Sequence, residues 1–70
     1  MEDQITIQLN GRPHRTARDS SVTALLAELG FAVQPVLVER NGTALFPREF
    51  SGTLLNDNDA LEVIRIVAGG

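Results

Sequence analysis

Residues 4–11 read QITIQLNG, and this short stretch decides the fold because it predicts a β-hairpin as the first element of the chain. Apolar and polar residues alternate through its first six positions, as a strand with one buried face requires. The apolar positions are Ile5, Ile7 and Leu9. The following pair, Asn10-Gly11, best tolerates the positive φ at both central positions of a type I′ turn. The sequence therefore predicts a β-hairpin whose second strand runs through residues 12–18.

A helix is predicted directly after this hairpin. Apolar residues at the spacing i, i+3, i+4 and i+7 form one stripe along it. They are Val22, Leu25, Leu26 and Leu29. Ser20 or Ser21 can cap its start, because a serine oxygen accepts a hydrogen bond from a free backbone N–H. Gly30 is a natural residue to follow the helix, and Phe31 lies where a Schellman motif would fold it back onto the apolar stripe. We therefore expect one short helix over residues 21–29.

The remaining elements follow from β-branched runs and turn residues. They are strands at 36–40 and 43–46 around a second Asn-Gly pair, a loop at 48–53 with room for a helical turn, a turn at 56–59 and a last strand at 61–67. We expect an α+β fold, in which a mixed sheet of four to five strands carries one helix across one face. It forms a single domain over residues 1–70, with a flexible, extended C-terminal tail at 66–70.

Composition restricts the classes of function. The chain has 70 residues, a net charge of −3 and no cysteine, which removes disulfides and thiolate metal sites. A domain of this size has little core left over for an enclosed active site. Scattered single arginines disfavour nucleic acid and anionic membrane as partners, and no stretch has the length of a membrane span or the pattern of a signal peptide. We therefore expect a cytoplasmic protein that binds other proteins.

Two clusters of polar residues have the composition of chemical sites. His14, Asp19 and Ser20 are the residue types of a nucleophilic triad, but nothing in the pattern brings them within reach of one another. The second cluster consists of Asp57, Asp59 and Glu62. It lacks the glycine and the distal bidentate glutamate of a calcium loop. We expect Ser20 to serve as a helix cap, and the second cluster to be a solvated acidic turn with no metal.

The last strand carries apolar residues on both faces. If Leu61 and Val63 point inward, Ile64 and Ile66 point outward, because successive side chains of a strand alternate between faces. The same alternation on the neighbouring strand places Leu37 outward. Exposed apolar residues that gather in one place mark interaction surfaces. We expect Leu37, Ile64 and Ile66 to form one such patch.

Five stretches carry a resemblance to a known family. They are ITIQLNG at 5–11, SSVTALLAELG at 20–30, VLVERNG at 36–42, FPRE at 46–49 and LEVIRIVAGG at 61–70. In their order and spacing, closed by a diglycine, they resemble the ThiS family of ubiquitin-like, β-grasp sulfur carriers. The family usually has Asp-Gly-Asp where this chain has Asp57-Asn58-Asp59, and asparagine is the next best residue after glycine for a left-handed turn. The turn from Asn41 to Pro47 is one residue longer than usual.

The resemblance implies a sulfur carrier of thiamine biosynthesis that is acted on by enzymes and is not one itself. In the family, a ThiF-like enzyme uses ATP to adenylate the C-terminal carboxylate. Sulfur from a cysteine desulfurase or another persulfide donor then replaces AMP and gives a thiocarboxylate. Gly70 would therefore carry the reacting group, next to Gly69, and a ThiG-like thiazole synthase would receive the sulfur. No cofactor is expected on the chain, since the adenylating partner uses the ATP.

The same resemblance, together with the expected patch, indicates which side chains bind the partners. They are Leu37, Ile64, Ile66, Val67 and Ala68. Two other functions stay open for a β-grasp chain with this tail. One is the small subunit of molybdopterin synthase, a MoaD-like sulfur carrier, and the other is a ubiquitin-like modifier joined through Gly70 to lysine side chains. A plain interaction module without chemistry at its tail is a third class.

Overall fold

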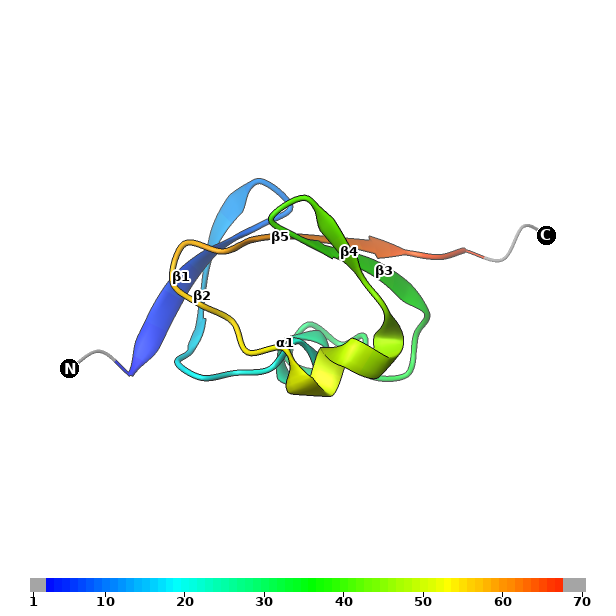
Figure 1. The fold of residues 1–70 in the computed structure, drawn as a ribbon, viewed down its shortest axis with the longest axis horizontal. Coiled ribbons are helices and arrows are strands. Elements are labelled where there is room, and N and C mark those ends of the chain that lie inside the picture. The colour runs from blue at the N-terminus through cyan, green and yellow to red at the C-terminus, as the bar shows by residue number, and fades with distance from the viewer. Residues whose placement is uncertain (1–2, 68–70) are drawn as a thin grey trace.

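The computed structural model of the chain describes residues 3–67. Along these residues the order is a first hairpin, a helix, a second hairpin, a 3-10 helix and a final strand (Figure 1). The elements are β1 (Gln4–Leu9), β2 (Arg12–Ala17), α1 (Val22–Glu28), β3 (Val36–Arg40), β4 (Thr43–Leu45), the 3-10 helix η1 (Pro47–Gly52) and β5 (Ala60–Arg65). No helix in this part of the chain has the length and apolar character needed to cross a membrane.

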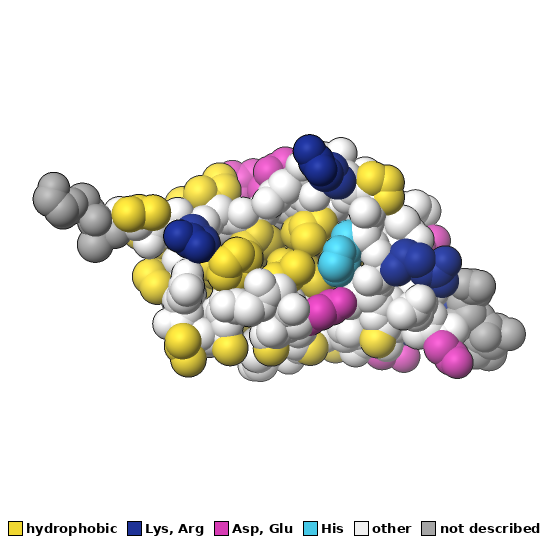
Figure 2. Space-filling model, turned by 180° about the vertical axis from the view of Figure 1, so that it is seen from behind, with side chains coloured by type: hydrophobic (Ala, Val, Ile, Leu, Met, Phe, Trp, Pro, Cys, Tyr) yellow, Lys and Arg dark blue, Asp and Glu magenta, His cyan; other side chains and the backbone are white. Residues whose placement is uncertain are grey.

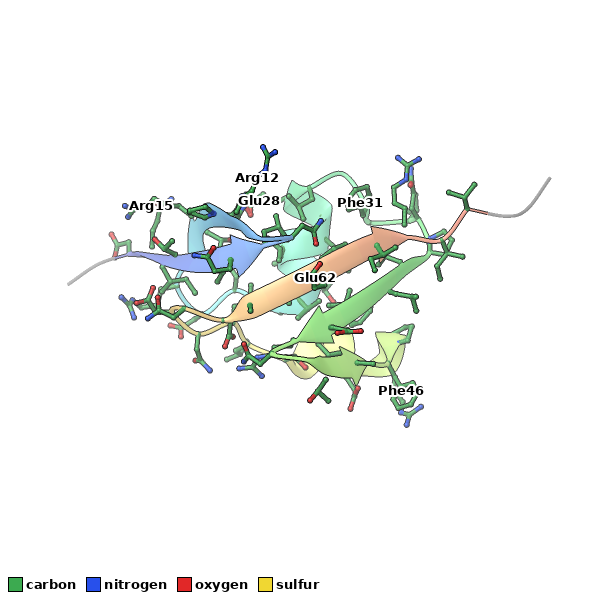
Figure 3. The ribbon with its side chains drawn as sticks, turned by 90° about the horizontal axis from the view of Figure 1, so that it is seen from above. Arg12, Arg15, Glu28, Phe31, Phe46 and Glu62 are labelled. Carbon is green, nitrogen blue, oxygen red and sulfur yellow. The ribbon has the colours of Figure 1, made fainter. Side chains whose placement is uncertain are left out.

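The strands form a mixed five-stranded sheet in the order β2-β1-β5-β3-β4. β5 pairs in parallel with β1 and antiparallel with β3, and each hairpin is antiparallel. Figure 3 shows β5 running through the middle of the sheet, with α1 behind it. Figure 1 shows α1 and η1 on the same side of the sheet. The predicted α+β, β-grasp fold is confirmed, with five strands.

The hydrophobic core lies between one face of the sheet and α1. The buried apolar residues are Ile5, Ile7, Val22, Leu25, Leu26, Val36, Val38, Leu55, Leu61 and Val63. In β1, β3 and β5, the residues that the sequence pattern predicted to point inward therefore face the core. Leu29, the last residue of the predicted helical stripe, is only partly buried at the margin of this core.

Both Asn-Gly pairs form the tight turns that the sequence predicts. The φ angles are 51° and 81° at Asn10 and Gly11, and 51° and 85° at Asn41 and Gly42. Positive φ at both central residues defines a type I′ turn, whose twist matches that of the flanking strands. Asn58, which stands where the family usually has glycine, has a φ of 70°. Asparagine thus adopts the left-handed turn conformation that the resemblance required of it.

The helix begins at one of the two serines proposed for it. The hydroxyl oxygen of Ser21 accepts a hydrogen bond from the Ala24 N–H at 3.0 Å. The expectation that Ser20 caps the helix is therefore wrong. Ser20 lies one residue too early, and its backbone carbonyl accepts instead from the Leu55 N–H at 2.8 Å. This bond ties the start of the helix to the segment that leads to β5.

The helix ends in the predicted Schellman motif. The Phe31 N–H donates to the Leu26 carbonyl at 2.7 Å, and the Gly30 N–H donates to the Ala27 carbonyl at 3.1 Å. Gly30 has a φ of 87°, a left-handed conformation that costs a residue with a Cβ atom more than it costs glycine. The chain therefore reverses at Gly30 and returns Phe31 to the end of the helix.

The last strand ends two residues earlier than predicted. Its final residue pairs with Val36, the first residue of β3. The Ile66 N–H still donates to the Pro35 carbonyl at 3.0 Å. Proline has no N–H with which to return a bond, so the ladder stops there. The regular strand pairing therefore ends before Ile66.

The predicted solvated acidic turn is wrong at Asp59, whose side chain is 7% exposed. Its carboxylate accepts hydrogen bonds from the Asn56 N–H at 2.8 Å, from Asn41 Nδ2 at 3.0 Å and from Arg40 Nε at 3.0 Å. Burial alone raises the pKa of a carboxyl, but these bonds and the Arg40 charge outweigh it and hold the pKa of Asp59 below its ordinary value. Asp59 is a structural anchor in front of β5.

The two turn asparagines also hold β5 in place through their side chains. The Val63 N–H donates to Asn10 Oδ1 at 2.7 Å, and Asn10 Nδ2 donates to the Val63 carbonyl at 3.1 Å. The Ala60 N–H donates to Asn41 Oδ1 at 2.8 Å. One turn from each hairpin therefore fixes the strand from which the tail departs.

Candidate functional site

The candidate site is the end of β5 together with the tail that leaves it. Leu37 and Ile64 lie directly opposite one another on the antiparallel strands β3 and β5. Their side chains point away from the helix and are 58% and 54% exposed. The alternation read from the sequence therefore places both on the outer face, as predicted. Their contact with a partner stays a prediction.

Acidic residues accompany this apolar pair on the outer face of the sheet. Glu39 and Glu62 also lie opposite one another across β3 and β5, and both are exposed. Like charges directly opposite on two strands repel each other. The outer face of this strand pair thus combines an exposed apolar pair with negative charge. Within residues 3–67 there is no group of three or more metal-ligating side chains.

Ile66, the first tail residue, lies at an open pocket on the end of the sheet. The pocket has a volume of about 480 Å³. Its lining consists of Leu26, Phe31, Ala32, Val33, Gln34, Pro35, Val36, Pro47, Phe50 and Ile66. We call this the tail-root pocket. Ile66 is 48% exposed and lines this pocket, while its predicted place in one patch with Leu37 and Ile64 stays a prediction.

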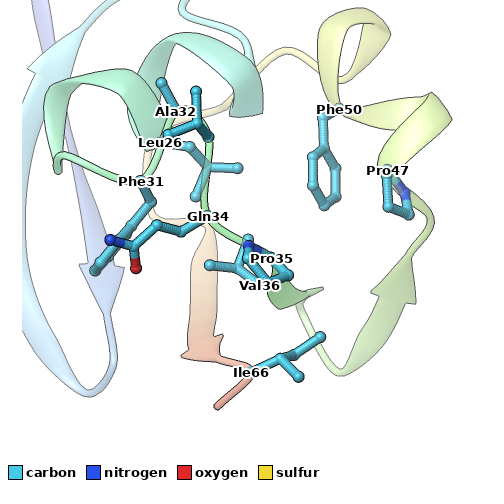
Figure 4. A pocket seen from close by; sticks show the side chains of 10 residues that line it. Leu26, Phe31, Ala32, Gln34, Pro35, Val36, Pro47, Phe50 and Ile66 are labelled. Carbon is cyan, nitrogen blue, oxygen red and sulfur yellow. The ribbon is translucent and has the colours of Figure 1, made fainter. Parts of the chain in front are cut away.

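The walls of the tail-root pocket come from two separate segments. Figure 4 shows Leu26 and Ala32 on one side, Pro47 and Phe50 on the other, and Ile66 at the end of β5. The Schellman motif at the end of α1 positions the first wall. The second wall belongs to η1, whose start is fixed by a hydrogen bond from the Phe46 N–H to Glu49 Oε2 at 2.7 Å.

The other predicted site residues fall partly beyond the described part of the chain. Val67 is 76% exposed. Ala68, Gly69 and Gly70 lie outside the described residues, so their predicted roles stay predictions. The described residues that the structure brings together are Leu37 with Ile64 on the outer face, and Ile66 with the tail-root pocket.

The structure does not assemble the triad of residue types noted in the sequence. His14 Nε2 lies 3.5 Å from Glu28 Oε1, and Thr16 Oγ1 donates to Glu28 Oε2 at 3.0 Å. Figure 2 shows the histidine beside an acidic side chain, next to a group of apolar side chains. His14 thus faces the helix, whereas Asp19 lies in the turn after β2 with a φ of 64°.

Sequence reasoning did not identify the tail-root pocket. Its walls are far apart along the chain, and a pocket of this kind depends on how two irregular segments pack. One signal was present in the sequence: Phe31, Ala32 and Val33 are apolar although they belong to no helix or strand. Val33 is 95% exposed. A search for apolar residues outside the predicted helix and strands would have found this segment.

Comparisons with known proteins agree with this fold. The sequence model of the ThiS family matches residues 7–70. The uncharacterized protein ycf40 of Pyropia yezoensis is 43% identical over 100% of this chain and 99% of its own length. The corresponding protein of Porphyra purpurea is 41% identical over 94% of this chain and 93% of its own length.

A thiazole synthase and a solved structure are also similar. The thiazole synthase of Magnetococcus marinus is 36% identical over 91% of this chain, a region that makes up 20% of that protein. The crystal structure of the thiamine biosynthesis protein ThiS from Geobacter metallireducens has a TM-score of 0.80 and 35% identity, and the match covers 94% of this chain and 100% of that one. The chain therefore belongs to the ThiS family.

Proposed function

We propose that this chain is a cytoplasmic sulfur carrier of thiamine biosynthesis, whose Gly70 carboxylate is the reacting group. The observation that carries the proposal is the match to the ThiS family along residues 7–70, which includes the diglycine. The arrangement of β5 supports it. Hydrogen bonds from the turns of both hairpins hold the central strand β5. The tail leaves from the end of β5, beside exposed apolar residues.

The proposed chemistry begins with activation by a ThiF-like enzyme, because a carboxylate is a poor electrophile. A carboxylate oxygen of Gly70 attacks the α-phosphorus of ATP, pyrophosphate leaves, and an acyl adenylate forms. The terminal sulfur of a persulfide, supplied by a cysteine desulfurase or another donor, attacks the carbonyl carbon and displaces AMP. A thiol then cleaves the resulting disulfide by thiol–disulfide exchange and leaves a thiocarboxylate on Gly70.

The chain itself contributes the acyl group and the surface that enzymes recognise. It has no cysteine with which to carry a persulfide. In this proposal it binds no cofactor, and the ATP is used by the adenylating partner. The chain is then a co-substrate and not an enzyme. Gly69 and Gly70 give the arm a small cross-section for entry into a narrow active site.

A ThiG-like thiazole synthase is the proposed sulfur acceptor. A relative named thiazole synthase contains a region 36% identical to 91% of this chain, which supports a link between the two proteins. The exposed pair Leu37 and Ile64, with Ile66, Val67 and Ala68, is proposed to contact the partner enzymes. Their position next to the reacting end supports this assignment, since an enzyme that binds the tail must cover its root.

Intact mass spectrometry tests the proposal. The purified chain is incubated with a ThiF-like enzyme, ATP and a persulfide donor, and we expect a mass gain equal to the replacement of one oxygen by sulfur. Omission of ATP is the control, and deletion of Gly70 should abolish the gain. An unchanged mass with an enzyme that charges another ThiS protein would contradict the proposal.

The acceptor decides between the proposed function and its alternatives. The thiocarboxylate form should supply sulfur to a thiazole synthase in a reconstituted assay of thiazole formation. Transfer to a molybdopterin synthase large subunit instead would identify the MoaD-like alternative. An isopeptide bond between Gly70 and lysine side chains of other proteins would identify a ubiquitin-like modifier.

A further inference from the structure

We propose that the tail-root pocket receives one bulky apolar side chain of the ATP-using enzyme that activates the Gly70 carboxylate. The inference rests on the proposed function and assigns the activating enzyme a contact on the helix side of the sheet. It is separate from the outer pair Leu37 and Ile64, which lies on the opposite face. The activating enzyme would then hold the end of the sheet from both faces.

The pocket has the chemistry of an apolar receptor. Nine of its ten lining residues are apolar, and the tenth, Gln34, is uncharged. Its volume of about 480 Å³ falls within the range of about 300–1,000 Å³ that is typical of ligand pockets. A charged group placed there would lose its hydration and find no charge among the lining residues to compensate it. The occupant that fits is an aromatic or aliphatic side chain.

The pocket is formed by segments with fixed positions. The Phe31 N–H bond to the Leu26 carbonyl holds one wall against the helix, at 2.7 Å. On the other wall, the Thr53 hydroxyl donates to the Glu49 carbonyl at 2.7 Å and closes η1. A preformed pocket binds a side chain with little ordering cost, which is what an anchor contact requires.

The length of the tail requires the activating enzyme to cover this pocket. Four residues follow Ile66 up to Gly70. At about 3.3–3.6 Å per extended residue, the Gly70 carboxylate lies within about 14 Å of Ile66. An enzyme that encloses this carboxylate in a water-excluding site must therefore bring its rim against the surface around Ile66. Ile66 itself lines the pocket, so the pocket lies inside that footprint.

The apolar surface around the pocket also indicates a protein partner. Val33, which lines the apolar pocket, is 95% exposed, and Val67, which follows the lining residue Ile66 in the chain, is 76% exposed. Clustered apolar exposure of this kind marks interaction sites on soluble proteins. Interfaces are commonly dominated by a few large side chains buried in pockets near their centre. The activating enzyme is the partner that every charging cycle needs, so we assign the occupant to it.

Steady-state kinetics of the activating enzyme test this contact. The Ala32→Trp variant fills the pocket from its own wall, and the Ala17→Trp variant carries the same change on the exposed edge strand β2 as a matched control. We expect Ala32→Trp to raise the KM for the carrier by about tenfold to a hundredfold, the effect of losing one buried apolar side chain. The kcat should change by less than about threefold, and Ala17→Trp should leave both constants near their wild-type values.

Methyl NMR of the unsubstituted chain gives a second readout that does not depend on the variant folding. Methyl groups of Leu26, Val36 and Ile66 should shift when the activating enzyme is added without ATP, and those of Ile5 should not. Unchanged pocket methyls, or an unchanged KM for a folded Ala32→Trp variant, would overturn the inference. A shift of these methyl groups when the carrier alone is concentrated would also overturn the inference, because it would indicate that a second copy of the chain occupies the pocket. A shift only with thiazole synthase would overturn it as well.

The two proposals fail in different ways. If the unsubstituted chain is charged and Ala32→Trp is charged with the same KM, only the pocket contact is refuted. If the unsubstituted chain is never charged, the sulfur-carrier function itself is refuted.

Discussion

Asp59 is the residue on which the fixed start of β5 depends. Its carboxylate joins a loop N–H, the side chain of a turn asparagine and the Arg40 guanidinium, and it is nearly inaccessible to water. Arg40 and Asn41 are 19 and 18 residues away in the sequence. A sequence pattern of closely spaced acidic residues therefore indicated a turn, but it could not indicate that one carboxylate is buried against distant partners.

Removal of this carboxylate should destabilise the protein strongly. Asp59→Ala leaves the Arg40 guanidinium and two N–H donors without their acceptor, and breaking such a partly buried pair costs about 3 kcal/mol. Asp57→Ala is the matched control, because its carboxylate is exposed and accepts one bond, from the Thr6 N–H at 2.9 Å. Its expected cost is about 1 kcal/mol. Urea unfolding of both variants measures the difference, and equal costs would contradict the role given to Asp59.

The lowered pKa of Asp59 predicts how stability depends on pH. The folded state favours the carboxylate, so its stabilisation is complete above the unfolded value of 3.8 and is lost as the pH falls through the lower folded value. The difference in unfolding free energy between the unsubstituted chain and Asp59→Asn should therefore be constant from about pH 7 to pH 5 and shrink below about pH 4. Urea titrations across this range measure it, and a difference that grows on acidification would have the wrong sign.

Among the elements, the helix and the first hairpin were predicted best, because local sequence determines them. The Schellman motif at the end of the helix, the apolar stripe and both Asn-Gly turns needed no distant contact to be recognised. The end of β5 was predicted two residues too late, since apolar β-branched residues continue through Val67. The strand stops where its neighbour offers Pro35, and that pairing is a property of the sheet.

One wall of the tail-root pocket could likewise be predicted from neighbouring residues, and the other wall depends on contacts between distant parts of the chain. The Schellman motif that places Phe31 was predicted from the residues around Gly30. The opposite wall was not, because η1 reaches the pocket only through the folding of the whole sheet around α1. The outer pair Leu37 and Ile64 was predicted because strand alternation alone assigns its face.

Substitution at the helix end tests how much the left-handed conformation of this motif contributes to stability. Gly30→Ala should cost about 1–2 kcal/mol, because its φ of 87° is unfavourable for a residue with a Cβ atom. An added Cβ would meet no atom within 4 Å, so the cost is conformational and not a clash. Gly52→Ala also enters open space, but without a positive φ, and serves as the control. Thermal or urea unfolding of both should show a loss for Gly30→Ala alone.

For the molecule as a whole, the core and the outer face of the sheet are separate, whereas the tail-root pocket shares Leu26 and Val36 with the core. The buried residues lie between the sheet and the helix, and the exposed Leu37 and Ile64 lie on the opposite face. Substitutions on the outer face should therefore affect partner binding and leave fold stability nearly unchanged. Two predictions follow from this separation.

The first concerns the outer face of the sheet. Leu37→Asp should change the unfolding free energy by less than about 1 kcal/mol, since the side chain is 58% exposed, but it should raise the KM of the activating enzyme for the carrier. Gln8→Asp introduces the same carboxylate on the exposed side of β1, opposite the beginning of β5, and serves as the control. Equal KM values for the two variants would remove the outer face from the proposed interface.

The second prediction concerns the length of the tail. Deletion of Ala68 shortens the reach of Gly70 by about 3.5 Å and should lower the rate of adenylation without changing the unfolding free energy. Replacement of Ala68 by glycine, which keeps the length, should retain most of the rate. ATP–pyrophosphate exchange measures the adenylation step. A shortened tail that is adenylated at the normal rate would contradict a fixed docking distance.

The parallel pairing of β1 and β5 also determines how the protein responds to mechanical force. The Gln8 N–H bond to the Asp59 carbonyl, the Asn10 N–H bond to the Leu61 carbonyl and the bonds between the Asn10 side chain and Val63 all run across the strands. A pull on the tail runs along β5 and loads these bonds together instead of opening them one at a time. An enzyme that draws the tail into its channel can therefore exert tension on the carrier without unzipping its sheet.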